Sequence, residues 1–252
     1  MSRNRSWLLA LCILPILAGC GGGAKEETAS APADNAPAAA PAADAGGISG
    51  SVTFAGQDTD TPIAMNADPV CASLHSTPVD TNEIAAKDGK LANVFVYVKS
   101  GLEGKTFPAP AEKKELDQQG CLYTPRVQGL QVGQALSIKN TDATLHNVHA
   151  LPKANQEFNQ AQPQGLPPFD KTFDKVEVPP VHVKCDVHPW MTAYVAVVDN
   201  PFYATSGEDG SFSIKNLPPG KYTLEAWHEK LGTKTQEVTI GPNQTANVTF
   251  AF

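Results

Sequence analysis

The chain has 252 residues, of which 41% are hydrophobic and 18% are charged, and it contains 20 glycines and 21 prolines. Because glycine and proline interrupt regular structure, this composition excludes an all-helical bundle and predicts a turn-rich globular protein. The formal net charge of −7 is opposite to what nucleic-acid binding requires, so no nucleic acid is expected as a partner.

The first residues have the organisation of an export signal. Arg3 and Arg5 form a positive n-region, and Trp7–Leu17 is an apolar run that is too short to span a bilayer. The run ends in Leu-Ala-Gly-Cys20, which resembles the bacterial lipobox and predicts a signal peptide over residues 1–19 with lipidation of Cys20. The alternative is an ordinary signal with a chance cysteine. No acid directly follows the cysteine, and in lipoprotein families this favours the outer membrane, here facing the periplasm.

Residues 20–47 contain almost no large apolar side chain and are rich in alanine and proline. Such a segment cannot bury enough surface to offset the conformational entropy that it would lose on ordering. We therefore expect a disordered linker that tethers the folded part to a lipid anchor in the membrane.

From residue 48 onward the sequence predicts short strands. Ile48–Phe54 and Val94–Val98 are β-branched and aromatic, and Ala135–Ile138 alternates at period two. Further strands are expected at Val176–Val178, Ala193–Val198, Ser211–Ile214, Tyr222–Ala226, Gln236–Ile240 and Asn247–Phe252. A long surface loop is expected over residues 153–172, and a short helix around Ala111–Leu116. The fold class predicted is all-β, a sandwich or barrel.

The roles of the five cysteines can be assigned by elimination. Cys12 leaves with the signal peptide and Cys20 is lipidated, so three remain in an oxidising compartment. Cys185 lies in a motif with its own chemistry, described below, which leaves Cys71 and Cys121 as a disulfide pair. The alternative uses Cys71 and His75 as metal ligands on one helical turn.

The segment Cys185-Asp-Val-His188-Pro-Trp-Met191 places a thiol, an imidazole and a thioether close together. Soft sulfur ligands combined with imidazole select copper, and a His₂Cys site with a weak axial methionine is used for single-electron transfer. His146, in Leu-His-Asn-Val-His149, supplies the second imidazole. His149 lies three positions further along the strand, so it faces the opposite side and is expected at the surface or beside the ligands.

Leu-His-Asn-Val-His followed 39 residues later by Cys-x₂-His-Pro-x-Met resembles the cupredoxins, in particular the amicyanin and plastocyanin-like group. The resemblance covers about residues 114–199 and implies a Greek-key β-sandwich with one type 1 copper ion. It implies that His146, Cys185 and His188 are the equatorial ligands and that Met191 is the axial ligand. It also implies that Asn147 donates its backbone N–H to the Cys185 sulfur. The alternative is a buried structural Cys185 with His188 capping a turn.

A second resemblance lies in residues 208–224, Glu-Asp-Gly-Ser-Phe-Ser-Ile-Lys-Asn-Leu-Pro-Pro-Gly-Lys-Tyr-Thr-Leu. This segment is similar to the carboxypeptidase regulatory-like (transthyretin-like) β-sandwich. Residues 200–252 offer about four strands, too few to close such a sandwich, and the early strands resemble its opening ones. We therefore predict a discontinuous sandwich over 48–108 and 200–252, with the cupredoxin domain inserted at 109–199. The alternative is two consecutive domains divided near Asp199.

Together these patterns predict an envelope-tethered copper protein that passes single electrons to redox partner proteins. The electrons are expected to pass through the exposed edge of His188, which is framed by Pro189, Trp190 and Pro152. The alternative is a non-catalytic envelope sandwich that binds a glycan or a protein, with copper structural or absent, although no specific residue supports a carbohydrate ligand. Paired acids, a Ser/His/Asp set and a phosphate-binding glycine loop do not stand out in the sequence, so we expect no enzyme.

Overall fold

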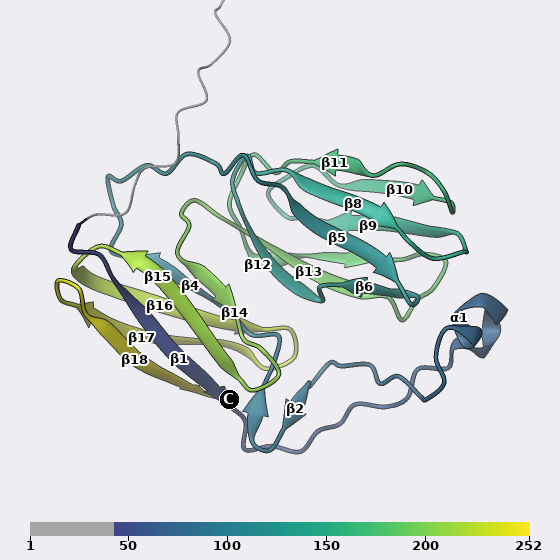
Figure 1. Ribbon diagram of the computed structural model, residues 1–252, viewed down its shortest axis with the longest axis horizontal. Helices are drawn as coiled ribbons and strands as arrows, with labels where there is room; N and C mark the ends of the chain where they lie inside the picture. Colours follow the sequence, from purple (N-terminus) through teal and green to yellow (C-terminus); the bar gives the residue numbers. More distant parts are fainter. Residues whose placement is uncertain (1–42) are drawn as a thin grey trace, which may run out of the picture. The chain divides into compact units, whose positions relative to one another are not determined.

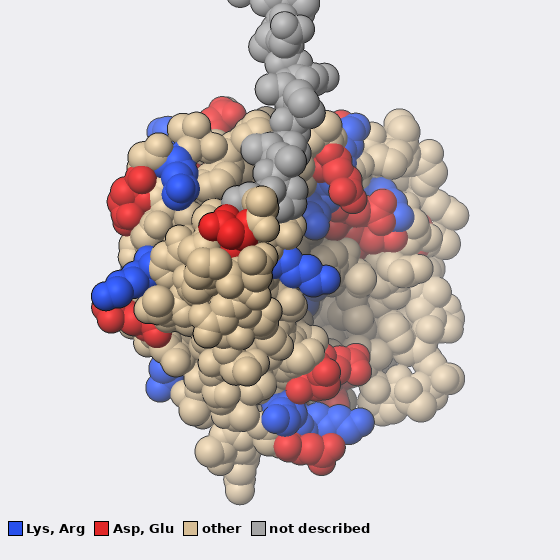
Figure 2. Space-filling model, turned by 60° about the vertical axis from the view of Figure 1, so that its left-hand side comes forward, with Lys and Arg blue, Asp and Glu red and all other residues tan. Residues whose placement is uncertain are grey.

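Two β-sandwiches make up residues 43–252, which are the residues that the computed structural model describes. The predicted signal peptide, Cys20 and residues 20–42 of the predicted linker lie outside them. The all-β class expected from the sequence is confirmed, because strands dominate and the only helices in the described part are very short. Acidic and basic side chains are interspersed on the face drawn in Figure 2, without a basic patch there.

The split sandwich is built from both ends of the described chain, residues 46–100 and 203–251. One sheet has the order β15-β1-β3-β2, with β18 parallel to β1: Ser211–Leu217, Gly46–Thr53, Lys90–Leu91, Ala86–Lys87 and Thr245–Ala251. The other has the order β14-β4-β16-β17: Tyr203–Thr205, Phe95–Ser100, Gly220–His228 and Gly232–Ile240. Figure 1 shows β1, early in the chain, beside β15 and β18 from its end. This pairing is the one that a discontinuous sandwich requires.

The inserted sandwich occupies residues 114–198. Its first sheet has the order β10-β9-β12-β13-β7: Phe158–Gln162, His146–Leu151, Glu177–Lys184, Thr192–Val198 and Val127–Gln131. Its second sheet has the order β11-β8-β5-β6: Phe169–Lys171, Leu136–Asn140, Lys114–Gln119 and Leu122–Thr124. One apolar cluster contains side chains from both sheets. Side chains of a strand alternate between its two faces. In β8, Leu136 and Ile138 accordingly alternate with half-buried residues and enter that cluster.

The segment between β1 and β2, residues 54–85, is called the strap here. It contains a 3-10 helix, Met65–Ala67, and α1, Pro69–Ser73. α1 begins where it does because the Asp68 carboxylate accepts the N–H groups of Val70 and Cys71, and proline stands at the first helical turn. Within residues 43–252, no helix has the length and apolar character needed to cross a membrane.

Two local predictions are wrong. Residues 111–116 hold good helix formers, but Lys114–Gln119 pairs in parallel with β8, so tertiary pairing outweighs helix propensity there. Residues 153–172 are not an irregular loop, because Phe158–Gln162 pairs with β9 and Phe169–Lys171 pairs with β8. The strand β10 is polar in sequence, yet Gln162 is fully buried and its Nε2 donates to the Ile138 carbonyl.

Glu177, at the start of β12, organises the turn after β9. It is 4% exposed, and its carboxylate accepts the backbone N–H groups of Lys153, Ala154 and Asn155 and the Asn155 side-chain amide. Burial raises the pKa of Glu177, but these hydrogen bonds outweigh burial and hold the pKa below its ordinary value of 4.5.

Replacing Glu177 with Gln is expected to lower the free energy of unfolding by about 1–3 kcal/mol, because the donors on one of the two carboxylate oxygens would then face an amide NH2 group. The pKa of Glu177 is lower in the folded than in the unfolded protein. Its contribution to the free energy of unfolding is therefore complete above the ordinary pKa and is lost as the pH falls below that value. Urea denaturation at neutral and at acid pH measures both effects, with the exposed Glu208→Gln as control. Equal stability of the two variants at neutral pH would contradict the prediction.

Candidate metal centre

Three side chains that lie far apart in the sequence converge inside the inserted sandwich. His146 is the first residue of β9, Cys185 directly follows β12, and His188 lies in the loop between β12 and β13. A ring nitrogen of each histidine and the Cys185 sulfur lie within 4.8 Å of one another. The exposed fractions of the three residues are 0%, 2% and 3%. The structure therefore brings together the three residues expected as equatorial ligands.

The two histidines face each other through Nδ1, at 2.9 Å. Their outer nitrogens meet carboxylates: His146 Nε2 is 2.9 Å from Asp142 Oδ2, and His188 Nε2 is 3.0 Å from Asp68 Oδ2. Because a carboxylate only accepts, the hydrogen-bond network places a hydrogen on each Nε2. Each Nδ1 is thereby directed inward, where the two nitrogens can share a proton or bind a metal ion. Two imidazoles with a thiol and a nearby thioether form a donor set that fits copper.

The loop that carries Cys185, His188 and Met191 is closed by its own backbone. Cys185 N–H donates to the Met191 carbonyl at 3.2 Å, and Met191 N–H donates to the His188 carbonyl at 2.9 Å. The His188 N–H points at the Cys185 sulfur, 3.3 Å away. Met191, expected as the axial ligand, is fully buried in the apolar cluster that also contains Cys185. The spacing of the motif is therefore the spacing of one tight turn between two paired strands.

Asn147 ties the β9 strand to this loop. Its Oδ1 accepts the backbone N–H groups of Asp186 and Val187, at 2.7 and 3.3 Å, and lies 3.3 Å from the Cys185 sulfur. Its backbone N–H is also one of the groups that lower the pKa of the Cys185 thiol. The side-chain contacts of Asn147 were not expected from the resemblance, which implied a backbone contact only.

The charges around the site favour a thiolate. Burial raises the pKa of the Cys185 thiol, but hydrogen bonds from His146 and from the backbone N–H groups of Asn147, His188 and Val187 outweigh burial and lower it. Burial likewise lowers the pKa of His146, but its hydrogen bonds to Asp142 and Cys185 outweigh burial and raise the pKa to about 9. The surroundings of the sulfur therefore favour a positive charge next to it.

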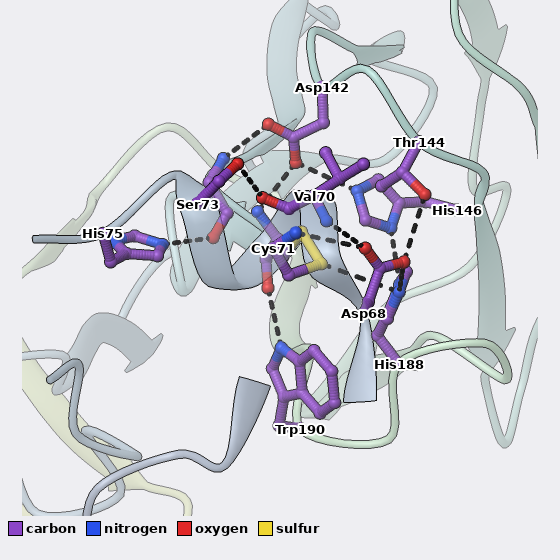
Figure 3. Close-up of a disulfide and its surroundings, with 12 residues drawn as sticks. Asp68, Val70, Cys71, Ser73, His75, Asp142, Thr144, His146, His188 and Trp190 are labelled. Carbon is purple, nitrogen blue, oxygen red and sulfur yellow. Dashed lines mark hydrogen bonds and ion pairs between the residues drawn. A yellow bond between two sulfur atoms is a disulfide. The ribbon is translucent and has the colours of Figure 1, made fainter. Parts of the chain in front are cut away.

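The expected exposed edge of His188 does not exist. His188 is 3% exposed because the strap covers it, with Asp68 Oδ2 on Nε2 and the Cys71 sulfur 3.6 Å from the same nitrogen. Figure 3 shows Asp68 and Cys71 of the strap beside His188 and Trp190. Nothing in the local sequence signals this cover, since 120 residues separate Asp68 from His188.

Cys71 of α1 and Cys121, between β5 and β6, form a disulfide, and Cys185 is the free cysteine of the described residues. The alternative metal pair of Cys71 and His75 is not formed, because His75 Nε2 instead bonds the Gly120 carbonyl at 2.7 Å.

Asp68 and Asp142, the hydrogen-bond partners of the two histidines, were not predicted from the sequence. For Asp142 a signal existed, because it precedes His146 by four residues.

His149 takes no part in the cluster. Its Nδ1 bonds Asp186 at 3.0 Å and its Nε2 bonds Glu157 at 2.9 Å, both on the outer side of β9. The hydrogen bond with Glu157 is the largest contribution that raises the pKa of His149. The alternation of strand side chains explains why His146 and His149 have different neighbours.

Comparison with known proteins gives one family match, to the carboxypeptidase regulatory-like domain, over residues 188–252. The match covers the late strands of the split sandwich and not the early strands that pair with them. No curated protein matches the chain.

Several solved structures are similar to parts of the chain. The purple cupredoxin from Nitrosopumilus maritimus is 20% identical, with 34% of this chain and 99% of that chain covered and a TM-score of 0.29. A Cu(I) form of an amicyanin mutant is 21% identical, with 40% and 97% covered and a TM-score of 0.30. The Cu-containing nitrite reductase from Thermus scotoductus is 16% identical, with a TM-score of 0.33; 59% of this chain is covered, but only 28% of that chain.

Proposed function

We propose that this protein is an envelope-tethered type 1 copper protein that carries single electrons between partner proteins and catalyses no reaction of its own. The observation that carries the proposal is the buried convergence of two Nδ1 atoms and the Cys185 sulfur, with the outer nitrogen of each histidine held by a carboxylate. A copper ion bound there would supply a one-electron couple. His146, Cys185 and His188 would hold it, with Met191 as the weak axial ligand.

The described residues explain why such a site would exchange electrons readily. The ligands stand on paired strands and on a loop closed by backbone hydrogen bonds, so their positions are fixed before any metal arrives. Burial excludes water from the donor atoms. A donor set that is held rigidly and kept dry would change little between two oxidation states, which is what a carrier needs.

The test is the visible spectrum of the full-length protein loaded with copper. We expect one copper ion per chain and intense visible absorption from sulfur-to-copper charge transfer, with zinc displacing copper poorly. A colourless protein that holds one Cu(II), or a preference for zinc in competition, would contradict the proposal. That result would favour a non-catalytic envelope sandwich that binds a glycan or a protein.

The tether is part of the same proposal. Cys20→Ser is expected to leave an unprocessed or soluble precursor, because the thiol is the acylation site of the lipobox-like segment. Fractionation of cells, including separation of inner and outer membranes, measures this, and Cys12→Ser is a matched control inside the same signal. If the unaltered protein were recovered free in the periplasm, the proposed anchor would be wrong.

A further inference from the structure

The two histidines of the proposed copper site are held from outside in the same way. Asp142 accepts from His146 Nε2 and Asp68 accepts from His188 Nε2, at 2.9 and 3.0 Å. Asp142 is buried, and the side chain of Asp68 is 22% exposed. Each aspartate therefore holds the outer nitrogen of one histidine.

A single disulfide joins these two carboxylate–histidine pairs. The backbone N–H of Cys71 donates to Asp68 at 3.1 Å, and the N–H groups of Gly120 and Cys121 donate to Asp142 at 2.7 Å each. The disulfide and these hydrogen bonds together form an unbroken series of contacts from one histidine to the other. Figure 3 shows the disulfide with the two aspartates and the two histidines around it.

We propose, building on the copper function above, that Asp68 and Asp142 are positioning residues for His188 and His146, and that the Cys71–Cys121 disulfide clamps Asp68 in place. A carboxylate behind a ligating histidine fixes its tautomer and ring orientation and raises the basicity of the ligating nitrogen. Its negative charge also favours the more positive oxidation state of a nearby metal. Both effects lower the reduction potential of the site.

The two aspartates depend on the disulfide to different degrees. Asp142 lies in the short connection between β8 and β9, four residues before His146, so its place is fixed by the inserted sandwich itself. Asp68 lies on the strap, ahead of a helix of five residues that is too short to be stable alone. Apart from the disulfide and the bond to His188, its neighbourhood is linked to the inserted sandwich by hydrogen bonds from Thr144 Oγ1 to Asp68 and from His75 to the Gly120 carbonyl, and by Met65, which enters the apolar cluster.

The experiment compares reduction potentials and the electron paramagnetic resonance spectra of Cu(II) in full-length, copper-loaded variants. Asp68→Asn keeps the shape and removes the charge, and we expect its potential to rise and its spectrum to change. Asp80→Asn removes the same charge from an exposed place on the same strap and should leave both unchanged. Asp142→Asn is expected to raise the potential as well, without involving the strap.

The clamp is tested by removing both sulfurs. The double variant Cys71→Ser/Cys121→Ser should raise the potential in the same direction as Asp68→Asn, and adding Asp68→Asn to it should produce little further change, because coupled groups are not additive. Full additivity would overturn the clamp. If Asp68→Asn matched the wild type, the positioning role would be overturned, and this comparison stands even if the double variant fails to fold. A wild type without charge-transfer absorption would instead overturn the copper function.

Discussion

Cys185→Ala is expected to abolish the intense visible absorption of the copper-loaded protein. The charge transfer that produces the absorption needs a thiolate bonded to the metal, and Cys185 is the free cysteine of the described residues. Cys71 and Cys121 are joined to each other and have no thiolate to offer. Absorption spectra recorded at equal copper content, with the metal quantified independently, measure the loss.

Met191→Leu is the contrast for that experiment. The side chain is buried and similar in volume to leucine, so the fold should be kept. A weak axial ligand tunes the potential of such a site and does not hold the metal, so the variant should keep its colour and shift its potential. A strong visible band that survived in Cys185→Ala would contradict the ligand set.

The convergence of His146, Cys185 and His188 was predictable because the residue types and their spacing appear in short stretches of sequence. Cys185, His188 and Met191 lie in one turn, whose spacing is set by the two strands that it joins. The strand that brings His146 to them is apolar on the side that enters the core, so the alternation of residues is visible in the sequence. The same logic separates His149 from the site, since it lies on the outer side of β9.

The cover of His188 was not predictable in this way. The strap has no regular pattern of its own, and its place over the site depends on a contact between residues 120 positions apart. β10 was missed for a related reason. Its buried residue Gln162 is polar and becomes acceptable inside only because Gln118 and the Ile138 carbonyl bond to its amide. Such compensation is a property of the assembled sheets and cannot be read from the strand alone.

Removal of the Cys71–Cys121 disulfide is expected to lower the free energy of unfolding by about 2–5 kcal/mol. The bond closes a loop with a sequence separation of 50 residues, for which chain entropy alone gives about 4 kcal/mol. Both cysteines are fully buried, so the sulfurs also contribute packing in the core of the inserted sandwich. Within the strap, backbone hydrogen bonds from Ile63 N–H to the Val79 carbonyl and from Thr81 N–H to the Thr61 carbonyl join the two segments that flank its short helices.

Denaturant unfolding of Cys71→Ser/Cys121→Ser against the wild type measures this loss, and Cys185→Ala under the same non-reducing conditions controls for the loss of a buried sulfur that closes no loop. Because that bond ties the strap, which lies over His188, to the inserted sandwich, proteolysis should cut residues 54–85 in the double variant before the sandwiches unfold. Peptide mapping without reductant identifies the cut and the bond together. Cys71 found joined to Cys185, or a double variant as stable as the wild type with an intact strap, would show that this bond does not hold the strap over the site.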